Sequence, residues 1–169
     1  MLEHKIDFMV TVEVREANAN GDPLSGNMPR TDAKGYGLMS DVSIKRKIRN
    51  RMQDMGYPIF VQASDRIEDE FRSLEKRFSN QFTGKTPDSE IEEKANQIWL
   101  DVRSFGQVFT YLKKSIGVRG PVSISMAKSL EPIVISSLQI TRSTNGMEAK
   151  NESGRSSDTM GTKHFVDYG

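Results

Sequence analysis

Residues 4–15 have the sequence HKIDFMVTVEVR, which is the clearest secondary-structure signal in the chain. Apolar side chains recur there at every second position: Ile6, Phe8, Val10, Val12 and Val14. Alternation with a period of two over this length is typical of a β-strand with one face on a core. We therefore predict a strand over residues 4–15 that belongs to a sheet.

A long loop follows this strand. It spans residues 17–38 and contains NANGDPLSGNMPRTDAKGYGL, which is rich in glycine, asparagine, aspartate and proline. Loops of this length without structure of their own are uncommon in compact domains and are often functional. A flexible surface excursion is the alternative interpretation that the composition leaves open.

A basic helix is predicted over residues 41–55, with Gly56 as its stop signal. Residues 42–53 contain five basic residues and no acid, and like-charged pairs recur at i, i+4, which weakens a helix. Such a helix indicates either a bound anion that neutralises these charges or a merely solvated basic face. Apolar residues form its other stripe: Ile44, Ile48, Met52 and Met55.

The next segment is predicted to be a helical insertion. A short strand at 58–62 precedes helices over 65–82 and 88–103, whose aromatic residues are expected to form a core. Residues 65–103 hold ten acids against seven bases, which makes this segment a poor phosphate-facing surface. Strands are predicted at 118–126 and 133–141, with AKSLEP as the linker between them. Residues 142–163 are nearly free of apolar residues, and 164–168 begin another strand.

The composition excludes several classes of protein. The 169 residues suit one domain with an insertion, and the net charge is +1. Cysteines are absent, so disulfide frameworks and thiolate metal sites are excluded. The only two histidines, His4 and His164, lie at opposite ends of the chain and leave almost no material for a histidine-rich metal site. No signal peptide or membrane-length apolar run is found. We predict a cytoplasmic protein without metal ligands or cofactors.

Motifs for catalysis are missing from the sequence. It contains no GxxxxGK[ST] phosphate loop, no GxGxxG after the first strand and no HExxH, so we predict a protein that is not an enzyme. One alternative stays open, because Asp22 and Asp32 in the long loop could hold Mg²⁺ for phosphodiester cleavage. Both residues also have ordinary roles in turns.

Four segments in order resemble one protein family. They are NANGDPLSGNMPRTDAKGYGLMSDVSIKRKIRN (18–50), DVRSFGQVF (101–109), GPVSISMAKSLEPI (120–133) and SSDTMGTKHFVDYG (156–169). Together they resemble the RAMP-superfamily backbone subunits of type I CRISPR interference (Cascade) complexes, most closely the type I-C (Dvulg) kind. Because members of that family are longer, and because the chain stops at a strand start, we expect it to be an N-terminal fragment.

The resemblance implies an α+β fold, namely a modified RRM-like or ferredoxin-like palm with a helical fingers insertion and a thumb hairpin, and with its C-terminal part missing. It implies five parts along the chain. Residues 1–56 would be the first part of the palm, 57–103 the fingers, 104–140 the palm continued, 141–163 the thumb, and 164–169 the start of a further palm strand.

The resemblance also implies an RNA-binding subunit of a ribonucleoprotein in antiviral defence. Copies would form a filament along one CRISPR RNA (crRNA) beside other Cascade subunits. The target DNA would be recognised by base pairing between the guide RNA and the DNA. Binding of any guide sequence calls for cationic and main-chain contacts to phosphates. The alternatives are a metal-dependent ribonuclease that uses a loop aspartate, as in related type III subunits, and a protein-interaction fragment dominated by the acidic helices.

The resemblance assigns the RNA contacts to particular residues. Asn18, Asn20 and Gly21 would form a turn against the RNA backbone, and Arg30, Lys45, Arg46 and Arg49 would bind phosphates. Met160 would be an apolar wedge at a displaced base, with Arg142 and Lys163 beside the RNA. The chain has no RNP1-like aromatic run, so base stacking on the sheet is not expected.

Overall fold

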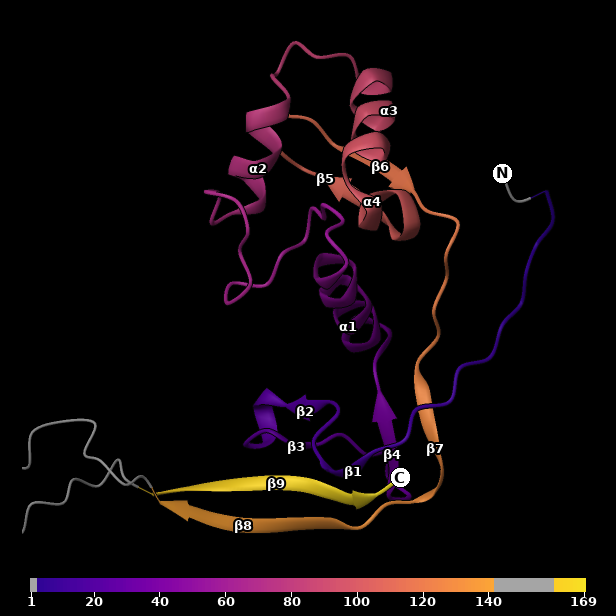
Figure 1. The fold of residues 1–169 in the computed structure, drawn as a ribbon, viewed down its shortest axis with the longest axis vertical. Coiled ribbons are helices and arrows are strands. Elements are labelled where there is room, and N and C mark those ends of the chain that lie inside the picture. The colour runs from indigo at the N-terminus through magenta and orange to yellow at the C-terminus, as the bar shows by residue number, and fades with distance from the viewer. Residues whose placement is uncertain (1–2, 142–159) are drawn as a thin grey trace, which may run out of the picture. The chain divides into compact units, whose positions relative to one another are not determined.

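The computed structural model describes residues 3–141 and 160–169, and the chain divides into two compact units. The strand unit comprises residues 1–40 and 126–169, and the helical unit comprises residues 41–125. The strand unit contains small antiparallel sheets, whereas the helical unit contains helices and one hairpin (Figure 1). The fold is therefore α+β, as predicted. The boundaries of palm, fingers and thumb stay predictions.

The strand unit is organised around a three-stranded antiparallel sheet in which β9 lies between β1 and β8. The strand unit also contains two separate two-stranded antiparallel sheets, β2–β3 and β4–β7. The strands predicted at 133–141 and 164–168 are confirmed as β8 and the end of β9. In chain order the elements are β1 (Arg15–Ala17), β2 (Gly21–Asp22), the 3-10 helix η1 (Pro23–Ser25), β3 (Met28–Pro29), β4 (Tyr36–Met39), β7 (Ala127–Pro132), β8 (Ile135–Thr141) and β9 (Met160–Tyr168).

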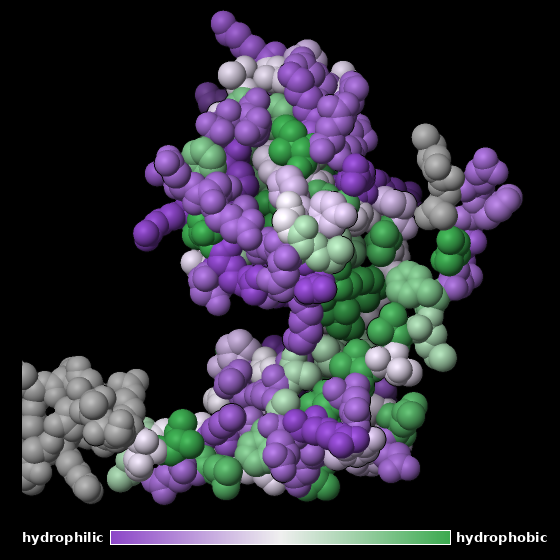
Figure 2. Space-filling view, viewed as in Figure 1, coloured by the Kyte–Doolittle hydropathy of each residue, from purple (hydrophilic) through white to green (hydrophobic). Residues whose placement is uncertain are grey.

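The predicted first strand is wrong for most of its length. Val14 exchanges two backbone hydrogen bonds with Gly169, at 2.8 and 2.9 Å, and none of the described strands pairs with residues 4–13. Ile6, Phe8 and Val10 are 59%, 63% and 70% exposed, and Figure 2 shows hydrophobic residues along this extended segment. Alternation signals a capacity to form a strand, but a strand also requires a neighbour that supplies hydrogen bonds.

The predicted linker AKSLEP is a strand. Its residues form β7, which pairs with β4 in a register that places Leu38 opposite Lys128 and Met39 opposite Ala127. The two strands are far apart in the sequence, so the partner of AKSLEP could not be recognised from its neighbours. Pro132 is the last residue of β7, and a proline is tolerated there because it ends the ladder.

The helical unit is built on an aromatic core, as predicted for its Phe and Trp residues. The rings of Phe60 and Trp99 lie 4.7 Å apart, and those of Phe78 and Phe109 lie 4.9 Å apart. β5 and β6 form an antiparallel hairpin that covers this core. The elements are α1 (Asp41–Asp54), α2 (Leu74–Gln81), α3 (Asp88–Ile98), α4 (Leu100–Phe105), β5 (Gly106–Phe109) and β6 (Ile116–Arg119).

The basic helix is confirmed as α1, which ends one residue before the predicted limit. Gly56 has a φ of +79°, and its N–H donates to the carbonyl of Gln53 at 2.7 Å. A glycine accepts this left-handed conformation without strain, so the helix stops where the sequence indicated.

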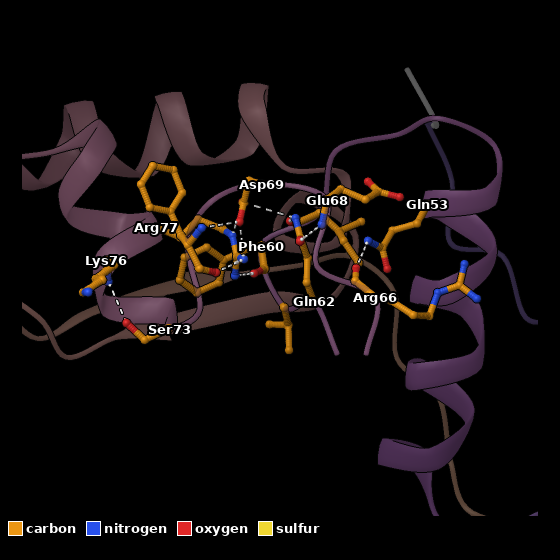
Figure 3. A network of polar contacts seen from close by, with 12 residues as sticks. Gln53, Phe60, Gln62, Arg66, Glu68, Asp69, Ser73, Lys76 and Arg77 are labelled. Atoms are coloured by element: carbon orange, nitrogen blue, oxygen red, sulfur yellow. Dashed lines mark hydrogen bonds and ion pairs between the residues drawn. The ribbon is translucent and has the colours of Figure 1, made fainter. Parts of the chain in front are cut away.

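The helix predicted from residue 65 begins only at Leu74, because the polar groups before it bind one another (Figure 3). The Asp69 carboxylate accepts two hydrogen bonds from the Arg77 guanidinium, at 2.5 and 2.7 Å, which holds the pKa of Asp69 below its usual value. Arg77 also donates to the carbonyl of Phe60. Ser73 then caps α2 by accepting the Lys76 N–H at 3.2 Å.

The helix predicted over 88–103 is two helices, and the short strand predicted at 58–62 is absent. Trp99 separates α3 from α4 with an extended backbone (φ −114°, ψ 115°), and its ring lies in the core. The N–H groups of Phe60 and Val61 donate to the Asp101 carboxylate, at 2.7 and 3.1 Å, instead of to a neighbouring strand. Tertiary contacts therefore override the local pattern at both places.

Candidate nucleic-acid interface

The predicted turn after the first strand is held together by its own residues. The Asn18 side chain donates to the carbonyl of Asn27 at 2.6 Å. A Cβ at Gly21 would lie 1.9 Å from Asn27 Oδ1, so a larger residue there would displace the Asn27 side chain. Asn18 lies before β2 and Gly21 is the first residue of β2, so both residues belong to the β2–β3 hairpin region. Their contact with RNA stays a prediction.

Asn20 and Arg30 lie together in the same loop. The Arg30 N–H donates to the carbonyl of Asn20 at 3.1 Å, and its guanidinium lies 3.2 Å from Asp22 Oδ1. The Arg30 side chain is 42% exposed, which leaves part of the guanidinium open to an anion. Asn18 Oδ1 and Asn20 Nδ2 are buried and make no hydrogen bond within the described residues. The structure thus gathers Asn18, Asn20, Gly21 and Arg30 in one loop of the strand unit.

The two loop aspartates act as turn residues. Asp22 accepts the N–H of Leu24 at 3.1 Å and caps η1. Asp32 accepts the N–H groups of Lys34 and Tyr36, at 2.8 and 3.0 Å, and its second oxygen lies 2.6 Å from Lys128 Nζ. Among the residues that the structure describes, no cluster of three or more acidic or histidine side chains is arranged to hold a metal.

We expect Lys128→Met to raise the pKa of Asp32 toward its ordinary value. The hydrogen bond from the Lys128 ammonium is the main reason that this pKa is depressed; burial opposes it, and the Tyr36 and Lys34 amides assist it. A depressed folded-state pKa stabilises the fold above the unfolded pKa, and this contribution is lost as pH falls through the folded pKa. The variant should therefore lose part of this stabilisation of the fold at neutral pH. An NMR titration of the Asp32 carboxyl carbon measures the change.

Lys34→Met is the matched control for that titration. Lys34 holds Asp32 only through its backbone N–H, which the substitution leaves in place. Its titration curve should overlay that of the wild type. Equal Asp32 pKa values in Lys128→Met and wild type would contradict the assignment.

Two basic residues of α1, Lys45 and Arg49, are paired with acids of the helical unit. Arg49 Nε donates to Asp101 Oδ2 at 2.9 Å, with side-chain exposures of 12% and 0%. Lys45 Nζ lies 3.1 Å from Asp41 Oδ2. The expectation of an external anion rested on the absence of acids from residues 42–53, but both acids lie outside that range. Arg49 is therefore a structural residue first.

Arg46 is also turned inward. Its guanidinium donates to the carbonyl of Val61 and to Asn50 Oδ1. Burial, followed by the charge of Arg49, holds the pKa of Arg46 below its usual value. Lys45 is held least firmly of the three, because its partner Asp41 is 43% exposed and exposed ion pairs contribute little. Among the predicted α1 ligands, Lys45 is the residue best placed to exchange its partner for a phosphate.

Met160 and Lys163 lie on β9 in the ribbon that this strand forms with β8. Lys163 is exposed opposite Leu138. Met160 is 65% exposed, and its sulfur accepts a hydrogen bond from Gln139 Nε2 at 3.3 Å. An exposed methionine on a strand ribbon suits an apolar wedge, although that role stays a prediction. Arg142 lies outside the described residues.

One surface was missed by sequence reasoning. A groove of about 590 Å³ in the helical unit is lined by the β5–β6 hairpin, Phe105 and Lys45, together with Gly120, Val122, Ser123 and Ile124. A signal for it exists in the sequence, since both strands of the hairpin carry a glycine, Gly106 and Gly117, where a strand usually carries a side chain. Without the strand register, these glycines could not be placed on one face.

Within the described part of the chain, no helix has the length and apolarity needed to cross a membrane.

Comparison with known proteins links the chain to one family. The model of a family described as "CRISPR-associated protein Cas7" matches residues 4–169. A curated CRISPR-associated protein Cas7 from Haloferax volcanii is 32% identical over 63 residues. That alignment covers 37% of this chain and 18% of the Haloferax protein, so the matched part is less than a fifth of that relative's length.

Proposed function

The chain belongs to the CRISPR-associated Cas7 family, and from this premise we propose that it is a crRNA-binding backbone subunit of a type I interference (Cascade) complex, of the type I-C kind. Its copies would form a filament along the guide with other Cascade subunits, in the cytoplasm, and target DNA would be recognised by base pairing to the guide. We assign the strand unit to an RRM-like palm and the β8–β9 ribbon to the base of the thumb.

The observation that carries this proposal is the family match over nearly the whole chain. The geometry supports it with cations that remain available to phosphates: Arg30, Lys45 and Lys163 are partly or fully exposed, and their side chains can exchange weak surface partners. Contacts of this kind bind RNA without regard to its sequence, which a subunit that carries many different guides needs.

The same proposal makes the protein a binding subunit and not an enzyme. Asp32, which a loop-aspartate ribonuclease would need, is hydrogen-bonded to two backbone amides and to Lys128. Its carboxylate is therefore committed to organising the turn that leads into β4. A complex that leaves complementary RNA uncut in the presence of Mg²⁺ is the expected result, and periodic cuts that disappear in Asp32→Ala would contradict it.

We expect Lys45→Gln to weaken RNA binding and to lower its dependence on salt. A phosphate contact with a single strand releases about 0.7 counterion, so the slope of log K against log salt should fall by about 0.7. Fluorescence anisotropy with a single-stranded RNA at several salt concentrations gives this slope. Arg49 is unsuitable for the same test, because replacing it would leave Asp101 unpaired in the core.

Lys94→Gln provides the matched control. Lys94 pairs with Glu90 at i, i+4 and 2.6 Å on α3, as Lys45 pairs with Asp41 on α1. It lies in the acidic segment, so its loss should leave the slope unchanged. Equal slopes for Lys45→Gln and wild type would remove Lys45 from the interface, and purified protein without bound RNA would overturn the proposed function itself.

A further inference from the structure

The β5–β6 hairpin has an open outer face with almost no side chains on it. The register places Gly106 opposite Arg119 and Val108 opposite Gly117, and opposed residues share a face of the ribbon. The other face carries Phe109, Ile116 and Val118 into the core. Val108, Gly117 and Arg119 are exposed on the outward face. Only Val108 and Arg119 contribute side chains there, and the two glycines leave bare backbone between them.

Gly117 has no structural reason to be glycine. Its φ is not positive, and a Cβ built on it would meet nothing within 4 Å. Gly106 differs, because its φ is +76° and a Cβ would lie 2.4 Å from the Val118 carbonyl oxygen. A glycine inside a strand weakens the strand, and it is found where a ligand approaches the backbone closely. The empty space above Gly117 is part of the groove.

The groove has the chemistry of a site for a flat, anionic ligand. Lys45 and Arg119 line it, and none of its lining residues is acidic. The Lys45 ammonium lies 5.9 Å from the centre of the Phe105 ring, which holds its charge at the groove. The Arg119 side chain is exposed and has neither an ion pair nor a side-chain hydrogen bond to any residue in the described part. Val108, 58% exposed, supplies apolar surface opposite Gly117.

We infer that this groove binds one nucleotide of single-stranded RNA. The phosphate lies within reach of Lys45 and Arg119, and the base packs flat on Val108 and on the bare backbone at Gly117. Single-strand binding proteins hold the backbone in a positively charged groove and pack bases on flat surfaces, most often aromatic rings, without reading the base. The inference rests on the proposed function and adds to it a contact made by the helical unit.

Gly117→Val tests the inference because it fills the groove without disturbing the fold. Valine suits an exposed strand position, and nothing within 4 Å opposes its Cβ. The probe is a single-stranded RNA that carries 4-thiouridine, added to the full chain after bound nucleic acid has been removed at high salt. We expect ultraviolet cross-links on the tryptic peptides 104–113 and 115–119, and roughly fivefold to hundredfold weaker binding for Gly117→Val.

Two further variants make the result decisive. Arg119→Gln removes a cation without filling space and should also weaken binding. Ser115→Val adds the same side chain to an exposed position of the hairpin outside the groove and should bind as the wild type does. RNA binding with cross-links only on other peptides, and with unchanged affinity in Gly117→Val and Arg119→Gln, would overturn this inference alone. A wild-type chain that binds no RNA would overturn the proposed function with it.

Discussion

Asp101→Ala is expected to lower the free energy of unfolding of the helical unit by about 3–5 kcal/mol. Asp101 is fully buried and accepts hydrogen bonds from Arg49 Nε and from the N–H groups of Phe60 and Val61, at 2.9, 2.7 and 3.1 Å. Alanine would leave a nearly buried guanidinium and two amides without an acceptor. Breaking a buried pair on one side costs far more than the pair itself contributes.

Trp99 makes this effect measurable. It is the only tryptophan of the chain, and its ring contacts Phe60, which bonds to Asp101. Urea denaturation followed by tryptophan fluorescence therefore reports on the affected core. Glu90→Ala, which breaks the exposed pair with Lys94, is the control and should change the stability by less than about 1 kcal/mol. Coincident midpoints for Asp101→Ala and wild type would contradict the structural role.

The second large loss of stability is expected for Gly106→Ala. Gly106 joins α4 to β5 with φ +76° and ψ 172°, a conformation that is essentially restricted to glycine and costs other residues about 1–3 kcal/mol. A Cβ would also lie 2.4 Å from the carbonyl oxygen of Val118 and 2.7 Å from the Gly120 nitrogen. Both contacts are with backbone atoms, so the clash can be removed only if the hairpin moves. The total loss of stability should therefore exceed the cost of the strained backbone conformation alone.

Gly117→Ala is the comparison that isolates this cause. It places the same methyl group in the same hairpin, where no atom lies within 4 Å. We expect its urea midpoint to equal or slightly exceed that of the wild type, since alanine reduces the entropy of the unfolded chain. If both alanine variants shifted the midpoint equally, the loss would reflect glycine content and not the geometry at Gly106.

Local signals predicted the parts of this fold that depend on local structure. The limits of α1 follow from its stripe of apolar residues and from Gly56, whose left-handed conformation needs no distant partner. The segment 4–13 shows the opposite case, because its alternation is strong but no described strand pairs with it. The break at Trp99 was equally invisible, since a core contact and not a helix-breaking residue causes it.

The candidate site divides in the same way. The composition marked Asn18 and Gly21 as part of a loop with special backbone needs, and in the structure they lie against Asn27 at the β2–β3 hairpin. The pairing of Arg49 could not be foreseen, because its partner Asp101 lies 52 residues further along the chain. The groove at Gly117 depends on the pairing of two strands, and no residue spacing reveals which face of a hairpin is bare.

The pairing of β4 with β7 has a consequence for how the chain folds during synthesis. Met39 lies opposite Ala127, so the first of these strands leaves the ribosome well before its partner exists. The helical unit lies between these two strands in the sequence and has its own core, so it can fold before the two strands pair. Once folded, it shortens the flexible loop that β4 and β7 must close, and loop-closure entropy falls as the flexible length falls. Folding of the helical unit thus lowers the entropy cost of pairing β4 with β7.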